Sequence, residues 1–110
     1  MEHPAPELEQ IARNELRFRE LNGRIAATVT QGRRQGPLGY VCECGDADCQ
    51  RLVDLSQSEY DAVREEPRRF FVVPGHELPR AEAVVDRVEG RYVVVEKPRD
   101  VMRALGTDDA

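Results

Sequence analysis

The sequence predicts a small α+β domain with an N-terminal amphipathic helix, a short second helix and a small antiparallel sheet, stapled by one zinc ion. Three features predict it. Apolar residues near the N-terminus recur at three- and four-residue steps, short β-rich runs in the second half are separated by turn residues, and three cysteines fall within eight residues. A chain of 110 residues builds only a modest core, so a metal crosslink would matter to its stability.

The first predicted element is a helix from about Glu7 to Val29. Pro6 suits its first turn, and the glutamates that follow suit the positive end of the helix dipole. One apolar stripe is expected along this helix, formed by Leu8, Ile11, Phe18, Leu21, Ile25 and Val29. On the other faces, three acid-first pairs at i,i+4 spacing are expected: Glu9 with Arg13, Glu15 with Arg19, and Glu20 with Arg24.

This apolar stripe needs a surface to cover it. We expect it to pack on the domain's own sheet. The alternative is that it pairs with another helix, from a protein partner or from a second copy in a homodimer. Gly23 lies in the middle of the helix and costs about 1 kcal/mol relative to Ala, so a break at this point is a second alternative.

Residues 31–39 separate the predicted helix from the rest of the chain. They contain three glycines, a proline and two adjacent arginines, with almost nothing to bury, which predicts a flexible connector. The predicted organisation is therefore an N-terminal helix and linker over residues 1–35, a zinc-binding α+β domain over residues 36–98 and a tail over residues 99–110.

A short strand and a short helix are predicted after the cysteines. Arg51–Leu55 has the composition of a strand, and the next four residues form a capping box in which Ser56 is the N-cap and Glu59 reaches back to it. The helix is expected over about Gln57–Glu65, and it ends before Pro67 because the residue preceding a proline disfavours helical geometry. It should turn two side chains inward, those of Tyr60 and Val63.

The remaining β-rich runs predict the sheet of three or four antiparallel strands. Phe70–Val73 has strand composition and is followed by a Pro-Gly turn. Ala81–Val88 and Arg91–Glu96 read as a hairpin joined at Glu89-Gly90, and Pro98 stops the last strand.

The three cysteines, Cys42, Cys44 and Cys49, form a C-x-C-x4-C motif. Charged residues make up 34% of the chain, no apolar run is long enough to span a membrane, and no signal peptide is visible, which predicts a cytoplasmic protein. In a reducing compartment, clustered thiols indicate metal or redox chemistry rather than disulfides. Gly45 is expected to give the loop a positive φ angle.

Zinc in structural sites takes four cysteine or histidine ligands in a tetrahedron. His76, on the Pro-Gly turn and separated from the last cysteine by 26 residues, is the favoured fourth ligand. The alternatives are a water molecule or another side chain, namely His3, Asp46, Asp48 or Glu77. The competing interpretations of the motif are three ordinary buried cysteines with a surface histidine, and an iron–sulfur or redox-sensing site.

A closed four-ligand site leaves no position for a substrate, so the predicted role of the zinc is structural and no catalytic residue is assigned. The predicted function is a non-catalytic protein-interaction or regulatory module. One alternative is a zinc-thiolate redox sensor, in which oxidation of the thiolates releases the ion. Another is a small zinc-dependent enzyme that uses Glu43 or Glu77 as its acid or base, although either is more often a solvated or supporting residue.

The charge balance argues against nucleic acid as a partner. The chain has a formal net charge of -5 and lacks a basic recognition helix. Outside the predicted connector the sequence has one compact basic group, formed by Arg64, Arg68 and Arg69. We expect it to be neutralised by the neighbouring acids Asp61, Glu65 and Glu66.

Several short motifs resemble a group of small uncharacterised proteins from actinobacteria. The resemblance runs from about residue 15 to residue 97. It rests on Val41-Cys42-Glu43-Cys44-Gly45, Cys49, Glu59-Tyr60, Val63-Arg64, Pro67, Phe70 and Pro74-Gly75-His76-Glu77. The resemblance implies a bacterial origin and supports treating the three cysteines and His76 as one constellation. It implies no activity.

Overall fold

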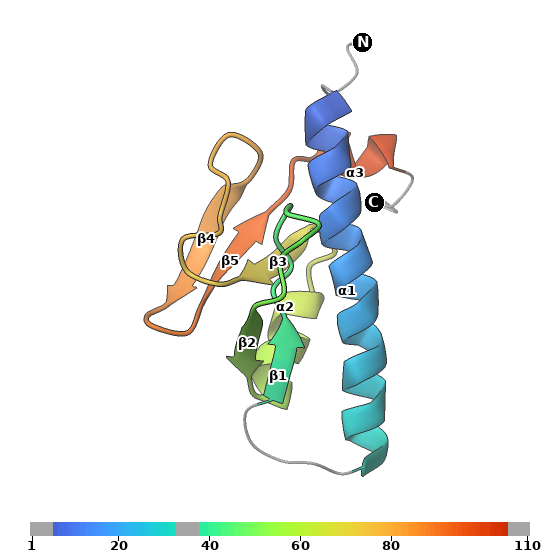
Figure 1. The fold of residues 1–110 in the computed structure, drawn as a ribbon, viewed down its shortest axis with the longest axis vertical. Coiled ribbons are helices and arrows are strands. Elements are labelled where there is room, and N and C mark those ends of the chain that lie inside the picture. Colours follow the sequence, from blue (N-terminus) through green and yellow to red (C-terminus); the bar gives the residue numbers. More distant parts are fainter. Residues whose placement is uncertain (1–5, 33–37, 106–110) are drawn as a thin grey trace.

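The computed structural model describes residues 6–32 and 38–105 and confirms the α+β class. The elements in chain order are α1 (Pro6–Gly32), β1 (Leu38–Val41), β2 (Leu52–Leu55), α2 (Gln57–Arg64), β3 (Arg69–Val72), β4 (Ala83–Val88), β5 (Tyr92–Glu96) and α3 (Arg99–Ala104). The long helix α1 lies along one side of the molecule, with the strands and α2 beside it (Figure 1). No helix in the described ranges combines the length and the apolar character needed to cross a lipid bilayer.

The strands form two small antiparallel sheets instead of the single sheet that was expected. β1 pairs with β2 in the first sheet, and the second has the order β3-β5-β4. The predicted hairpin is confirmed as β4 and β5, and its turn contains Gly90 at a φ of 77°, which favours glycine. β4 is the outer strand of this sheet, farthest from α1 in Figure 1.

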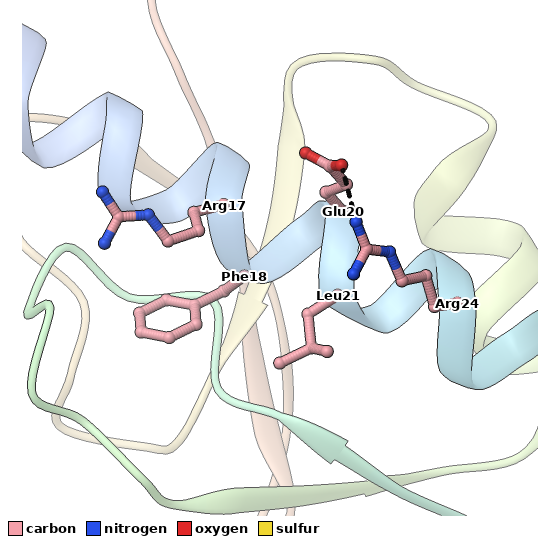
Figure 2. A pocket seen from close by; sticks show the side chains of 5 residues that line it. All are labelled: Arg17, Phe18, Glu20, Leu21 and Arg24. Atoms are coloured by element: carbon pink, nitrogen blue, oxygen red, sulfur yellow. Dashed lines mark hydrogen bonds and ion pairs between the residues drawn. The ribbon is translucent and has the colours of Figure 1, made fainter.

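Helix α1 runs without a break through Gly23, so the expected amphipathic helix is confirmed and the alternative of a break is wrong. The predicted apolar stripe, however, is only partly correct. Ile11 is buried, whereas Leu21 is 41% exposed. Leu21 and Phe18 lie together in a hollow on the outer surface of the helix, between Arg17 and Arg24 (Figure 2). The pairing of this helix with a partner or a second copy stays a prediction.

The inward face of α1 is unexpectedly polar, with Asn14, Glu15 and Asn22 all buried. The groups that this face packs against include polar ones, and the buried polar side chains of α1 form hydrogen bonds or ion pairs with them. Of the three predicted ion pairs, those of Glu9 with Arg13 (3.8 Å) and of Glu20 with Arg24 (3.3 Å) form. The third does not, because Glu15 pairs with Lys97 and Arg19 donates a hydrogen bond to the carbonyl oxygen of Pro67.

Lys97, the only lysine of the chain, is buried between two buried carboxylates. Its Nζ lies 2.7 Å from Glu15 Oε1 on α1 and 3.1 Å from Glu82 Oε1, just before β4. The three groups form a crosslink between α1, the start of β4 and the end of β5. We call Glu15, Glu82 and Lys97 the buried ionic cluster.

Two elements were not predicted. β1 occupies the end of the segment that was expected to be a flexible connector, and its Tyr40 stacks on Tyr60 of α2 with ring centroids 4.7 Å apart. α3 occupies the first half of the expected tail, and its Val101 and Met102 are buried. The rest of the expected connector (residues 33–37) and the last residues of the tail (106–110) lie outside the described residues.

The capping box and the helix that it starts are confirmed. The Glu59 backbone N–H donates to Ser56 Oγ (3.2 Å), and the Ser56 backbone N–H donates to Glu59 Oε1 (2.8 Å). Tyr60 and Val63 face inward as expected. They pack with β3, whose Phe70 and Phe71 are fully buried, so this helix covers the core that positions the cysteine segment.

Candidate metal centre

The segment 42–49, which we call the cysteine loop, is held between the two sheets. Its first residue continues β1, because the Cys42 backbone N–H donates to the Arg51 carbonyl (2.9 Å). The next residue joins the second sheet, because the Glu43 backbone N–H donates to the Phe71 carbonyl (2.9 Å). The loop then turns back on itself, with a bond from the Cys49 backbone N–H to the Asp46 carbonyl (3.1 Å).

His76 is presented to this loop by a turn that follows β3. The His76 backbone N–H donates to the Val73 carbonyl (2.9 Å), and Gly75 takes a φ of 95° in between. At that angle an L-residue with a side chain would be strained, which is the physical reason for the glycine. Glu77 supports the turn, because its Oε1 accepts the Gly75 backbone N–H (2.8 Å).

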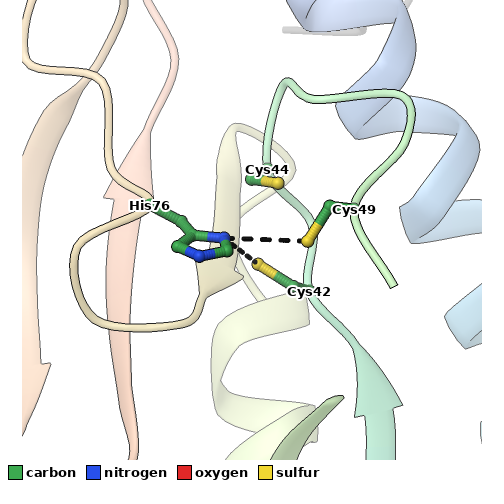
Figure 3. A group of neighbouring side chains, drawn as sticks. All are labelled: Cys42, Cys44, Cys49 and His76. Atoms are coloured by element: carbon green, nitrogen blue, oxygen red, sulfur yellow. Dashed lines mark hydrogen bonds between the residues drawn. The ribbon is translucent and has the colours of Figure 1, made fainter. Parts of the chain in front are cut away.

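The structure brings together all four residues that the sequence singled out. One donor atom from each of Cys42, Cys44, Cys49 and His76 lies within 4.8 Å of the other three, a group that could hold a metal ion. The side chains point toward one another from the cysteine loop and from the turn (Figure 3). The histidine offers its Nδ1 atom, which lies 3.5 Å from Cys42 Sγ and 3.7 Å from Cys49 Sγ.

Each sulfur accepts a hydrogen bond from a backbone N–H, and such bonds favour the thiolate form. Cys42 Sγ accepts from Val73 (3.2 Å), Cys44 from Asp46, and Cys49 from Arg51.

The thiols also act on one another. The hydrogen bond from Cys42 lowers the pKa of Cys44 to about 5, while the hydrogen bond to Cys44 and burial raise the pKa of Cys42. Burial is the main cause that raises the pKa of Cys49. Burial and a neighbouring thiolate therefore both oppose a second negative charge in this group, and a bound cation would favour it.

The other proposed metal ligands are used differently. Asp46 and Asp48 are exposed, and Asp46 Oδ1 accepts the Asp48 backbone N–H (2.9 Å), which shapes the loop. Glu77 caps the turn and pairs with Arg87 (3.3 Å), and backbone N–H groups lower its pKa. His3 lies outside the described residues. Within the described chain, His76 is the residue that completes the group of four.

Glu43, the other candidate acid or base, is fully buried and surrounded by donors. Its carboxylate oxygens accept hydrogen bonds from Asn22 Nδ2 (2.8 Å), from the Phe71 backbone N–H (3.2 Å) and from the Arg64 guanidinium. Burial raises the pKa of Glu43, and Arg64 and Asn22 oppose that shift. These bonds occupy the carboxylate, so its role in the fold is to anchor the cysteine loop to α1, α2 and β3.

Sequence reasoning missed the two asparagines that attach α1 to the cysteine loop. Asn14 Nδ2 donates to the Gly45 carbonyl (2.8 Å), and Asn22 exchanges two hydrogen bonds with the backbone of Val41 (2.8 Å each). The available signal was their spacing of eight residues, which places both on one helical face. These three bonds join the asparagines to backbone groups of Val41 and Gly45, which leave no mark in the sequence.

The basic group of Arg64, Arg68 and Arg69 at the end of α2 is neutralised, but mostly by other acids than those expected. Arg64 pairs with Glu43 and stacks over Tyr60 and Phe71, with its guanidinium carbon 5.3 Å and 5.1 Å from the ring centroids. The other two arginines share Glu96 of β5, at 3.7 Å from Arg68 and 3.1 Å from Arg69. Among the expected acids, Glu66 contributes one weaker contact with Arg68 (3.9 Å).

Gly45 has a steric role rather than the predicted conformational one. The described glycines with positive φ are Gly75 and Gly90, so the expectation of a positive φ at Gly45 is wrong. A Cβ atom at Gly45 would lie 2.5 Å from Ile11 Cγ2 and 3.3 Å from Leu78 Cδ1. Only glycine lets α1 and the turn after β3 approach the cysteine loop this closely.

We therefore expect Gly45→Ala to lower the free energy of unfolding by about 1–3 kcal/mol, the usual range for overpacking. The matched control is Gly23→Ala. Gly23 is an exposed position inside α1 where an added Cβ meets no atom within 4 Å, so this variant should gain up to about 1 kcal/mol. Urea denaturation measures the free energy of unfolding of both variants. Equal changes in the two variants would contradict the steric role of Gly45.

Comparisons of the chain with protein-family models, with curated proteins and with solved structures find no match.

Proposed function

We propose that this is a small zinc-binding protein with a structural Cys3His site, and that it serves as a non-catalytic protein-interaction or regulatory module. The spacing of the donor atoms is the observation that carries the proposal. Zinc binds thiolate sulfur at about 2.3 Å and imidazole nitrogen at about 2.0–2.1 Å, and a tetrahedron with those bonds separates sulfur from nitrogen by about 3.6 Å. The two sulfur–nitrogen distances here are 3.5 Å and 3.7 Å.

The chemistry of the donors supports zinc over other metals. Three thiolates and an imidazole form a soft, nitrogen- and sulfur-containing set, whereas magnesium and calcium prefer oxygen ligands. Iron–sulfur clusters usually take four cysteines, and this chain has three. A zinc ion with three thiolates carries a net charge of -1, and the backbone N–H groups that point at each sulfur offset part of that charge.

A structural role is supported by the closure of the site and by the acids around it. Four protein ligands complete the tetrahedron and leave no position for water or substrate. The two carboxylates that could assist a reaction, those of Glu43 and Glu77, are both engaged in bonds that hold the fold. In this arrangement the ion would tie the cysteine loop, between the two sheets, to the turn after β3.

The proposal is tested by elemental analysis of protein purified without added metal, with one zinc per chain as the expected result. We expect His76→Ala and Cys49→Ser to lose zinc affinity strongly, and the matched control His3→Ala to keep it. Substitution by cobalt(II) provides a second readout, because the visible spectrum reports tetrahedral geometry and thiolate ligation. Full zinc content in His76→Ala together with zinc loss in His3→Ala would overturn the ligand set.

A further inference from the structure

We propose that the three thiols also make this site sensitive to peroxide, with Cys49 as the residue attacked first and Cys44 as its disulfide partner. This inference rests on the proposed zinc site and adds a regulatory property to it. The starting observation is that the three cysteine residues differ in exposure. Cys42 and Cys44 are only 1% and 3% exposed, whereas Cys49 is half-buried and lies between residues that are exposed, Asp48 and Gln50.

A surface hollow reaches the cluster at Cys44 and His76. It has a volume of about 220 Å³ and is lined by Cys44, Gly45, Asp46, Gly75, His76 and Leu78. The donor atoms of the group lie within 4.8 Å of one another, so a disulfide bond requires two sulfurs to move closer. Cys44 borders the hollow and Cys42 does not, so of the two buried thiols Cys44 has more room to move toward Cys49.

The reaction has two steps. In the first, the Cys49 thiolate attacks one oxygen of hydrogen peroxide, the O–O bond breaks, and the sulfur becomes a sulfenic acid while hydroxide leaves and takes up a proton to form water. In the second, the Cys44 sulfur attacks the Cys49 sulfur, an S–S bond forms and the S–O bond breaks, which releases a second water. In total, two thiolates, one peroxide and two protons give one disulfide and two waters.

Oxidation would replace a crosslink between distant parts of the chain by a crosslink between two residues of the same loop. The zinc site would connect the cysteine loop to His76 on the turn after β3, whereas a Cys44–Cys49 disulfide closes only the loop itself. The ion loses two of its four ligands and leaves. The turn after β3 is then no longer fixed to the loop, so peroxide would loosen the structure as removal of the metal does.

The experiment measures zinc release from the zinc-loaded protein with a chromogenic chelator during a titration with hydrogen peroxide. We expect release of one zinc per peroxide consumed, and recovery after a dithiol reductant and zinc are added. Cleavage before Asp46 or Asp48 separates Cys44 from Cys49, so mass spectrometry of the digested protein identifies the disulfide. A protein that binds zinc but keeps it under peroxide would overturn this inference alone, whereas a protein without zinc would overturn the proposed function.

A matched variant is Cys49→His. It replaces the thiol of the most exposed cysteine by an imidazole nitrogen, which can also bind zinc. We expect it to release zinc at least tenfold more slowly than the natural protein at the same peroxide concentration. An unchanged rate in the zinc-loaded variant, or a Cys42–Cys44 disulfide in the natural protein, would overturn the assignment of Cys49. If the variant does not bind zinc, the disulfide mapped in the natural protein tests the assignment of Cys49 instead.

Discussion

Removal of zinc by a chelator is expected to unfold the protein or to loosen it strongly. Apparent binding energies of structural zinc are about 10–16 kcal/mol, against a total stability of about 5–15 kcal/mol for a typical domain. A loss of only 3 kcal/mol would lower Tm by roughly 10–20 °C for a domain of this size. Circular dichroism melts before and after chelation, and again after zinc is restored, measure the effect.

The contacts around the site indicate which parts of the structure would loosen after zinc is removed. The metal would join the cysteine loop to the turn after β3, and α1 reaches that loop through Asn14 and Asn22. Both attachments depend on the position of the loop, so helix α1 should loosen with it. An unchanged melting curve, in a sample whose zinc loss is verified by elemental analysis, would contradict a stabilising role for the metal.

The parts of the site that could be predicted from the sequence are those specified by local chemistry. Three cysteines within eight residues indicate a metal without knowledge of the fold. The Pro-Gly pair before His76 indicates a turn, and a turn is a place where a side chain is held in a defined position. The capping box of α2 is local in the same way, because both of its hydrogen bonds join residues three positions apart.

The parts that could not be predicted depend on partners far away in the chain. β1 is a strand because β2 pairs with it, and its own short sequence with Gly39 is typical of a connector. The inward face of α1 was assigned from apolar periodicity, yet Asn22 and Glu15 lie on it because Val41 and Lys97 offer them bonds. Periodicity cannot detect a polar residue that is buried with a distant partner.

The buried ionic cluster leads to the second large expected effect, which concerns the pH dependence of stability. Two carboxylates and one ammonium carry a net charge of -1 in a site without solvent, unless a proton is bound. Burial, followed by the hydrogen bond and the negative charge of Glu82, raises the pKa of Glu15 to about 10, although Lys97 acts in the opposite direction. Glu15 therefore keeps its proton in the folded protein at neutral pH, and the cluster as a whole is neutral.

The sign of the effect follows from linkage. The unfolded chain loses this proton near the ordinary pKa of 4.5, whereas the folded chain holds it to about 10. Between these values the folded state binds more protons, so the contribution of Glu15 to stability is lost as the pH rises, by at most about 1.4 kcal/mol per pH unit. Zinc binding has the opposite dependence, because its thiolate ligands must be deprotonated.

Glu15→Gln separates the two effects, because glutamine imitates the neutral carboxyl group and leaves the metal ligands unchanged. We expect the variant and the natural protein to be similarly stable near pH 5, and the variant to be more stable by several kcal/mol at pH 9, with both saturated with zinc. Urea denaturation at a series of pH values measures this difference.

The matched control is Glu9→Gln, at a partly exposed ion pair on the same helix. Its free energy of unfolding should follow that of the natural protein at every pH. A constant difference between Glu15→Gln and the natural protein from pH 5 to pH 9 would mean that Glu15 is ionised in the folded state. The cluster would then hold α1 as a charged triad rather than as a proton-bound, neutral one.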